Sequence, residues 1–315
     1  MIRFSLNEFL CPQRCYDFLL KVLHPNGLAC PQGHPLPADQ APHDRHRAPI
    51  MDYRCRQCGK VFNVFTDTVW EKSRYTCETI LLILQGIVQG KSTKHLAEEL
   101  DLDRSWLLKR RHQIQSQAQR ALLRTALPDL VTEADEMYQN AGEKGQKHSD
   151  PTDPPRRRAN KRRGHGTWDN DRPPVLGIVG RTTGQIRLTV CKNSQRRTLQ
   201  PKVEAATQPE ATVNTDEWKA YDRLPETGRS HASVCHTPGQ REWARDDDGD
   251  GKREVHCNTL EGIWTGLRNF LRPFRGVHKK YLGQYVAIFE WAHNLKEATL
   301  DYLRRLMGCF TPEPT

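Results

Sequence analysis

Three acidic residues occur where the local pattern predicts regular structure, and together they could bind divalent cations. Asp216 ends the β-branched run TVNTD, residues 212–216, and Asp135 lies in the apolar–acidic alternation DLVTEADEMY, residues 129–138. Glu261 lies in HCNTLEGIWTGLRNFLR, where apolar residues recur at helical spacing. Three carboxylates held close together repel one another, which raises at least one pKa unless a cation neutralises them. Two Mg²⁺ ions in such a site would activate a water or hydroxyl and stabilise the leaving oxygen of a phosphodiester.

A second set of candidate ligands lies in the segments CPQGH and CRQC. Two pairs of soft ligands separated by about twenty residues are typical of a zinc ribbon, because each tight turn supplies two ligands to one tetrahedral Zn²⁺. A module this small has little apolar core, so the metal would supply much of its folding free energy. The predicted zinc ligands are Cys30, His34, Cys55 and Cys58. Because the first pair ends in His rather than Cys, nearby residues are alternatives: His43, His46 and the pair Cys11/Cys15.

A basic helical segment follows in KSTKHLAEELDLDRSWLLKRRHQIQ, residues 91–115. We expect two short helices joined by the DLD turn, with Thr93 capping the first and Asp103 capping the second. This layout predicts a helix-turn-helix whose second helix presents a basic face to DNA. A solvated helical hairpin without a DNA contact is the alternative. The outward-facing residues predicted to contact DNA are Arg104, Lys109, Arg110 and Arg111.

The rest of the pattern predicts the elements that must position these side chains. Residues 21–76 combine Pro, His and Cys with an aromatic alternation that favours a small β-hairpin, and residues 77–125 are helical by period. Residues 139–173 are rich in Pro, small polar and basic residues, which predicts a basic loop insertion. Around that loop we expect four strands: one from about residue 126 and one each in PVLGIVGR, GQIRLTVCK and ATVNTD. We expect a short helix in TLQPKVEAAT and two further helices over about 258–272 and 281–305. Residues 222–257 are expected to be irregular.

Composition limits the class of protein. The 315 residues are 36% hydrophobic and 27% charged, enough for a real core and for two or three domains. The net charge of +10 favours a polyanionic partner such as nucleic acid. No stretch approaches 18 consecutive apolar residues, so we expect no membrane span. The N-terminal residues do not resemble a signal peptide, so the ten cysteines are expected to be thiols and metal ligands in a reducing compartment.

The segment DDDGDG, residues 246–251, has the acids and the glycine of a calcium-binding loop at their usual positions. The twelfth position of that loop would be Cys257, where the site needs a bidentate Glu. We therefore expect a solvated acidic loop.

Together these motifs resemble bacterial insertion-sequence transposases of the DDE superfamily, in particular the Merlin-related group with an N-terminal zinc ribbon. The resemblance runs from about residue 25 to 305, and TDEWKAY and NTLEG-x-W are its most specific segments. It implies an α/β fold in which an RNase H-like catalytic domain, a mixed sheet with flanking helices over 126–305, follows a zinc ribbon over 21–76 and a helix-turn-helix module over 77–125. The other matching segments are YRCRQCGKVFNVFTDT, EADEMY, PPVLGIVGR and VHCNTLEGIWTGLRNFLR.

The resemblance also implies roles for single residues. Asp135, Asp216 and Glu261 take the places of the first, second and third catalytic carboxylates, which hold Mg²⁺ or Mn²⁺. Asn258 is the second candidate for the third position, since some related transposases use Asn there. Arg268, seven residues after Glu261, would contact a DNA phosphate near the cut.

The implied function is a DNA transposase that binds the terminal inverted repeats of an insertion sequence, cleaves the strand end with Mg²⁺ and transfers the freed 3′-OH to target DNA. Its partner would be double-stranded DNA, and synapsis of two ends predicts a homodimer or a larger assembly in the cytoplasm, associated with the nucleoid. His231 and His236 also match family positions and are expected to have structural or DNA-contacting roles. Two alternatives are a sequence-specific DNA-binding protein with an inactive transposase-like domain and a metal-dependent nuclease without strand transfer.

Overall fold

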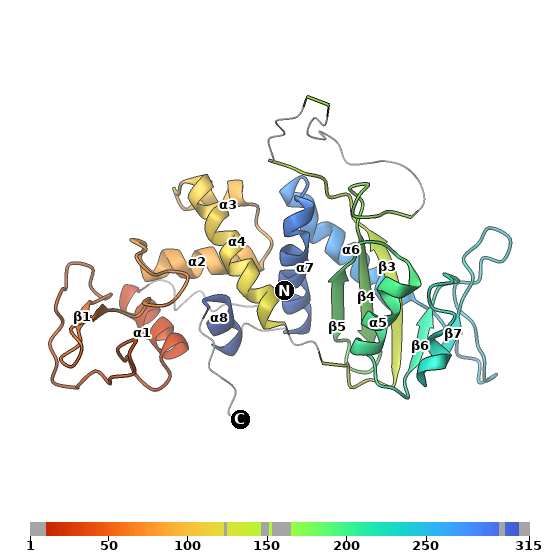
Figure 1. The fold of residues 1–315 in the computed structure, drawn as a ribbon, viewed down its shortest axis with the longest axis horizontal. Coiled ribbons are helices and arrows are strands. Elements are labelled where there is room, and N and C mark those ends of the chain that lie inside the picture. The colour runs from red at the N-terminus through yellow and green to blue at the C-terminus, as the bar shows by residue number, and fades with distance from the viewer. Residues whose placement is uncertain (1–10, 123–124, 146–150, 153–164, 296–299, 309–315) are drawn as a thin grey trace. The chain divides into compact units, whose positions relative to one another are not determined.

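The computed structural model describes residues 11–122, 125–145, 151–152, 165–295 and 300–308. The chain divides into two compact units, residues 1–121 with 295–315 and residues 122–294 (Figure 1). We call the first the terminal unit and the second the sheet unit, and we describe each by itself. Among the described residues, no helix combines the length and the apolar composition that crossing a membrane requires.

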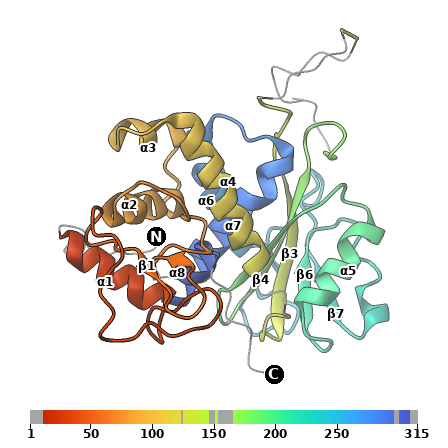
Figure 2. The ribbon, with the colours of Figure 1, turned by 60° about the vertical axis from the view of Figure 1, so that its left-hand side comes forward.

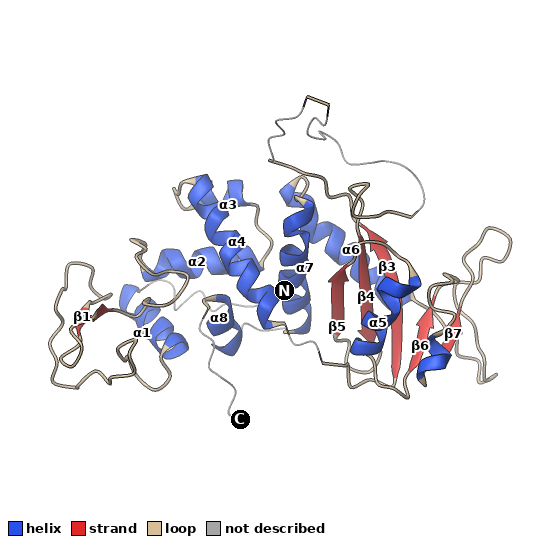
Figure 3. Ribbon diagram, viewed as in Figure 1, coloured by secondary structure: helices blue, strands red, loops and turns tan. Residues whose placement is uncertain are grey.

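The terminal unit is mostly helical, with one short hairpin (Figure 3). The strands of this hairpin pair Tyr53 with Phe62 and Arg54 with Val61, which confirms the hairpin expected from the aromatic alternation. The elements of the unit are α1 (Pro12–Leu23), β1 (Tyr53–Arg54), β2 (Val61–Phe62), α2 (Cys77–Val88), α3 (Thr93–Glu99), α4 (Arg104–Ala121) and α8 (Leu300–Leu306).

A tight turn joins α3 to α4, and each helix begins at a capping side chain. Ser92 Oγ accepts a hydrogen bond of 3.2 Å from the backbone N–H of His95, so Ser92 caps α3. The prediction that Thr93 is this cap is wrong by one residue. Asp103 caps α4 as predicted, since its Oδ1 accepts a bond of 2.6 Å from the backbone N–H of Trp106.

The chain returns to the terminal unit after the sheet unit. Helix α7 ends at Asn294, so the prediction of one helix over 281–305 is wrong; residues 296–299 lie outside the described residues. α8 then packs against α1 and α4. The backbone N–H of Val69 donates to the carbonyl of Met307 at 3.1 Å, which ties this returning segment to the terminal unit.

The sheet unit is built on one five-stranded sheet with the order β5–β4–β3–β6–β7. The central strand β3 pairs antiparallel with β4 and parallel with β6, so the expected mixed sheet is confirmed. The strands are β3 (Val131–Tyr138), β4 (Pro174–Gly180), β5 (Ile186–Val190), β6 (Thr212–Thr215) and β7 (Ser230–Ser233). β7 lies inside the stretch 222–257 that we expected to be irregular, because its sequence SHAS lacks the apolar alternation of a strand.

Helices cover both faces of the sheet (Figures 1 and 2). α6 and α7 pack on one face in the same core as Met137, and α5 packs on the other in the same core as Ala134. β4 is buried along its whole length between these layers, which fits its continuous apolar run. The helical segments are α5 (Arg196–Ala206), the 3₁₀ turn Leu224–Thr227, α6 (Asn258–Leu271), the 3₁₀ turn Arg272–Phe274 and α7 (Lys279–Asn294).

Of the predicted basic insertion, residues 139–173, the structure describes 139–145, 151–152 and 165–173. Its first described part is held at the end of α6: Lys144 Nζ donates to the carbonyls of Phe274, Arg275 and Gly276 at 2.9 to 3.1 Å. Near its other end, Asp171 accepts a bond of 3.1 Å from Lys279 Nζ. The two described ends of the insertion are therefore bonded to the segment that follows α6 and to Lys279, the first residue of α7.

Candidate acidic site and cysteine cluster

Side chains along β3 alternate between the two faces of the sheet, as they do on any strand, and residues 133–136 follow this alternation. Glu133 and Asp135 face α6, where they accept hydrogen bonds from Leu260 N and Trp264 Nε1. Ala134 and Glu136 face the other layer. The strand therefore carries two sets of acids that lie in different environments.

The chain direction of the sheet brings Asp216 to the same end of the sheet as Asp135. β3 and β6 are parallel, and the last pair of their ladder is Glu133 with Asn214. Two residues further along come Asp135, inside β3, and Asp216, which directly follows the last residue of β6. The charge of Asp216 acts on Asp135, so the two carboxyls lie near one another.

The pKa directions of Asp135 and Asp216 indicate burial and repulsion from neighbouring carboxylates. Burial raises the pKa of Asp135 to about 6, and the charges of Asp216 and Glu261 raise it further, while the bond from Trp264 lowers it. Burial also raises the pKa of Asp216, and the adjacent charge of Glu217 adds to this. Buried carboxyls that lie near one another disfavour their charged forms, and a bound cation would offset that cost.

Glu261 lies in the first turn of α6 with an exposed side chain. Its charge reaches Asp135, but the three acids do not form a tight group. Among the described residues, only two sets of three or more ligand atoms lie within 4.8 Å of one another, and neither contains these acids. They do not enclose a single ion in this arrangement.

Asn258 and Arg268, also exposed on α6, have no described role that separates them from other surface residues, so their predicted roles stay predictions.

Glu133 and Trp264 are functional candidates that the sequence did not single out. Glu133 is 0% exposed and is bonded to the beginning of α6 and to Arg181. Trp264 belongs to the apolar residues at helical spacing, and its indole N–H donates to Asp135 Oδ2 at 2.7 Å. The signals available in the sequence were the two-residue spacing of Glu133 from Asp135 and the tryptophan of NTLEG-x-W.

Two imidazoles lie close enough to Asp216 to lower its pKa, those of His236 and His165. The backbone N–H of His236 donates to Glu217 Oε2 at 2.9 Å, and its ring stacks on the exposed Trp243 with centroids 4.7 Å apart. The ring of His165 lies 4.1 Å from that of Trp218. His231 instead lies 2.8 Å from Thr215 Oγ1, inside the sheet. The sequence pointed to His236 and His231 but not to His165.

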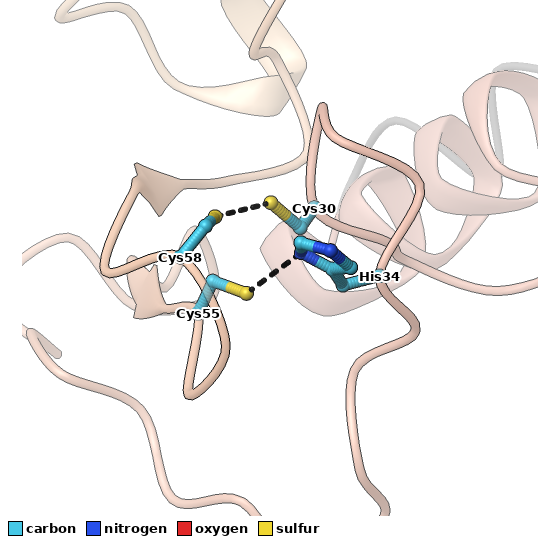
Figure 4. A group of neighbouring side chains, drawn as sticks. All are labelled: Cys30, His34, Cys55 and Cys58. Carbon is cyan, nitrogen blue, oxygen red and sulfur yellow. Dashed lines mark hydrogen bonds between the residues drawn. The ribbon is translucent and has the colours of Figure 1, made fainter.

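The four predicted zinc ligands form one cluster, which we call the cysteine cluster (Figure 4). Cys30 Sγ lies 3.4 Å from Cys58 Sγ, and Cys55 Sγ lies 3.4 Å from His34 Nδ1. All four ligand atoms lie within 4.8 Å of one another. Around a tetrahedral Zn²⁺ with bonds of 2.0 to 2.3 Å, ligand atoms are about 3.6–3.8 Å apart. The donor set and its spacing therefore fit zinc.

The backbone around the cluster supports this fit. Gly33 and Gly59 have φ of +81° and +71°, which lets the chain turn tightly after each first ligand. The backbone N–H of Cys58 lowers the pKa of the Cys55 thiol to about 6, which favours the thiolate that binds metal. The alternative ligands His43, His46, Cys11 and Cys15 lie outside the cluster, and the His46 side chain is 92% exposed.

The basic residues of α4 do not all point outward. Arg104 and Lys109 are exposed, and Arg110 is half-buried with its guanidinium 5.3 Å from the Trp106 ring. Arg111 is 0% exposed and donates to the carbonyl of Lys91 at 2.6 Å. The expectation that Arg111 faces outward is wrong, because this position lies on the buried side of the helix with Leu107.

The acidic loop at 246–251 binds its own backbone. Asp246 accepts bonds of 2.6 and 2.9 Å from the N–H groups of Gly249 and Gly251. Asp246, Asp248 and Glu254 also place ligand atoms within 4.8 Å of one another. Exposed acidic loops adopt this geometry without an ion, so it does not distinguish a metal site from the solvated loop that the sequence predicts.

Known proteins resemble most of this chain. The family model of the ISXO2-like transposase domain matches residues 129–294. An uncharacterized protein in the transposable element ISH50 of Halobacterium salinarum is 28% identical over 291 residues, which are 90% of this chain and 92% of the relative. An uncharacterized transposase-like protein of Haemophilus influenzae is 25% identical over 125 residues, 39% of this chain and 94% of the relative.

Likeness to solved structures is slight. A pre-cleavage Mos1 transpososome covers 75% of this chain and 78% of its own at 11% identity, with a TM-score of 0.28, too low to bear on the fold. The family match is the stronger finding, because it spans more than half of the chain and includes Asp135, Asp216 and Glu261. The chain belongs to the family of the ISXO2-like transposase domain.

Proposed function

We propose that this transposase binds the ends of an insertion sequence, cleaves them with Mg²⁺ or Mn²⁺ and joins the freed 3′-OH to target DNA. The sheet unit would be an RNase H-like catalytic domain. Its support is the mixed sheet with helices on both faces, which the resemblance to DDE transposases leads us to expect. The observation that carries the proposal is the family match over residues 129–294, which contains Asp135, Asp216 and Glu261.

In the proposed mechanism Asp135 on β3, Asp216 directly after β6 and Glu261 on α6 would hold the metal. Bound there, the divalent ions would activate the attacking water or hydroxyl and neutralise charge on the leaving oxygen. Asp135 and Asp216 would bind metal in their ionised forms, because carboxylates are the ligands. Arg268, on the same exposed face of α6, would hold a phosphate of the strand that is cut.

DNA binding is assigned to the terminal unit. α3 and α4 would form the helix-turn-helix, with Arg104 and Lys109 contacting phosphates or bases. The cysteine cluster would hold Zn²⁺ as the centre of a zinc ribbon, where the metal supplies folding free energy to a module with a very small core. We propose double-stranded DNA as the partner and a homodimer or larger assembly as the synaptic form, in the cytoplasm and on the nucleoid.

A cleavage assay on DNA that carries the element's inverted repeats, with Mg²⁺ present, tests the proposal. We expect the wild-type protein to release a 3′-OH end, and both Asp135→Asn and Asp216→Asn to lower the rate at least about 100-fold while DNA binding is retained. Glu210→Gln, at an exposed position outside the site, is the control. If Asp135→Asn cleaves like the wild type, the catalytic proposal fails.

The same assay separates the alternatives. Binding without cleavage by the wild type would indicate a DNA-binding protein with an inactive domain. Cleavage without joining of the cut end to a target plasmid would indicate a nuclease. Replacement of Glu261 by Gln and of Asn258 by Ala, each compared with wild type, identifies the third ligand, because only the true ligand should show the loss.

A further inference from the structure

We propose that two polar contacts between β3 and α6 set the position of Glu261 relative to Asp135, and that Glu133 and Trp264 are positioning residues of the metal site. We call the set Glu133, Asp135, Leu260 and Trp264 the β3–α6 clamp. The inference rests on the proposed function, since it concerns how the same acidic site is held.

The first contact joins Glu133 to the beginning of α6. Glu133 Oε2 accepts a bond of 3.2 Å from the backbone N–H of Leu260, and Oε1 accepts one of 2.8 Å from Thr259 Oγ1. A carboxylate at a helix N-terminus satisfies free N–H groups and interacts favourably with the helix dipole. Because Glu133 is 0% exposed, releasing these bonds would leave its buried carboxylate oxygens with fewer hydrogen-bond donors, which is costly.

Arg181 extends this contact to the segment before α6. Its Nε donates to Glu133 Oε1 at 3.0 Å, and its Nη atoms donate to the carbonyls of Glu254 and His256, the latter at 2.7 Å. The guanidinium thus balances the buried charge and holds the chain that leads into the helix. The direction in which α6 begins is fixed by side chains of the sheet.

The second contact joins Trp264 to Asp135 itself. The indole Nε1 donates to Asp135 Oδ2 at 2.7 Å, which orients the plane of that carboxyl. Gly177, the partner of Asp135 on β4, provides the room: a Cβ there would lie 2.4 Å from Trp264 Cη2. A larger residue at position 177 would push the tryptophan off the sheet, so this pairing depends on the glycine.

The two contacts lie on either side of Glu261 along the helix. Leu260 precedes it by one residue and Trp264 follows it by three, so the turn that carries Glu261 is bonded to β3 at both ends. An α-helix rises 1.5 Å per residue, and a slide or rotation of α6 large enough to move Glu261 by one position would break both bonds. Groups held this way bind a metal with less reorganisation.

If Glu133 and Trp264 only stabilised the fold, replacing them would lower stability without changing metal affinity. The test therefore measures metal affinity directly. Zinc-loaded full-length protein is titrated with Mn²⁺ by calorimetry, and the binding lost in Asp135→Asn defines the acidic site. Trp264→Phe keeps an aromatic side chain and removes the indole N–H that donates to Asp135. Glu133→Gln and Thr259→Val weaken the contact between Glu133 and the beginning of α6. We expect each to lower Mn²⁺ affinity at that site about 10- to 100-fold.

Asp129→Asn is the matched control. Asp129 is also a buried acid of the sheet unit, with its carboxylate bonded to Thr182 and Thr183, but it has no described contact with α6. It should leave Mn²⁺ affinity within about 2-fold of wild type even if it lowers the melting temperature. If Glu133→Gln does not fold, Trp264→Phe and Thr259→Val decide, because both leave the buried charge pair intact.

The outcomes separate the two proposals. If Trp264→Phe and Thr259→Val bind Mn²⁺ as the wild type does, while Asp135→Asn does not bind, the clamp is refuted and the metal site stands. If Asp135→Asn binds Mn²⁺ like the wild type, there is no metal site at Asp135, and both the clamp and the proposed chemistry are refuted.

Discussion

Asp135 and Glu136 are neighbours on β3, yet their carboxyls lie on opposite faces and have different partners. Asp135 is bonded to Trp264 beneath α6, whereas Glu136 Oε1 accepts a bond of 2.6 Å from the buried hydroxyl of Tyr221. Burial raises the pKa of Glu136 to about 8, and the charges of Asp135 and Asp216 add to this. Glu136 is therefore a protonated structural acid at neutral pH, next to acids that we propose to be ionised when metal is bound.

This pKa predicts a pH dependence of stability. Glu136 keeps its proton in the folded protein up to about pH 8, while an unfolded glutamate loses it near its ordinary pKa of 4.5. Between these values the folded state binds more protons, so the free energy of unfolding falls as pH rises. Glu136→Gln should remove that part of the fall, by at most about 5 kcal/mol. Melting temperatures from pH 5 to 9, without added Mg²⁺, measure it.

Glu210→Gln, at an exposed position, should keep the wild-type slope. An unchanged slope in Glu136→Gln would mean that Glu136 is already ionised at neutral pH in the folded protein.

Two glycines of the sheet unit should respond to alanine in opposite ways. Gly177→Ala places its Cβ against Trp264, and we expect it to lower the free energy of unfolding by about 1–3 kcal/mol. Gly262 lies in α6, and a Cβ added to it would meet no heavy atom within 4 Å, so Gly262→Ala should raise stability by about 1 kcal/mol. Urea unfolding measures both. Equal effects would show that α6 does not lie as close to β4 as described.

At the scale of elements, the sequence predicted strands and helices with strong patterns and missed those without one. α6 begins and ends within one residue of its expected bounds, because its apolar residues keep a clear helical period. β7 was missed, since SHAS is short and polar and becomes a strand only by pairing with β6. The cap of α3 was misplaced by one residue, between two adjacent hydroxyl side chains that can both cap a helix.

The candidate site was predicted only in part for a related reason. The type and spacing of its residues predicted the cysteine cluster, whereas the roles of Asp135 and Asp216 came from the resemblance to transposases and stay predictions. The sequence could not reveal that Arg111 is buried or that Trp264 bonds to Asp135, because both depend on which side of a helix meets a neighbour. Helical period gives the apolar side of a helix, but long polar side chains can lie on its edge.

Helix α4 allows a prediction that separates two basic residues. Lys109 is exposed, so Lys109→Ala should weaken DNA binding and reduce the salt slope by about 1, with an unchanged melting temperature. Arg111 is buried and donates to Lys91, so Arg111→Ala should lower stability by about 1–3 kcal/mol. Binding titrations at several salt concentrations and thermal melts measure both. A stable Arg111→Ala protein with a reduced salt slope would contradict its burial.

At the scale of the whole molecule, both compact units have buried apolar side chains, but the cysteine cluster within the terminal unit has little core of its own. The sheet unit has extensive apolar cores on both faces of its sheet, whereas the cysteine cluster has only a small core around it. The metal that we propose for the cluster should therefore matter to one unit and not to the other.

This difference predicts the effect of a zinc chelator. A protein of residues 122–294 alone should unfold cooperatively at a temperature that the chelator does not change. The full chain should show an additional transition that moves to lower temperature with the chelator and in Cys58→Ser. Calorimetry measures both proteins. If the chelator destabilises the fragment, or leaves the full chain unaffected, the cluster is not a structural zinc site.

The return of the chain to the terminal unit affects the order in which the molecule can be made. α8 packs against α1 and α4, so part of the terminal unit is encoded after the whole sheet unit. On the ribosome, the sheet unit can fold as it emerges. At that point α1 and α4 cannot yet pack against α8, because α8 has not been translated. A nascent chain released before α8 is translated would contain the acidic site but an incomplete terminal unit. The proposed catalytic unit would therefore finish folding before the proposed DNA-binding unit, although most of the DNA-binding unit is translated first.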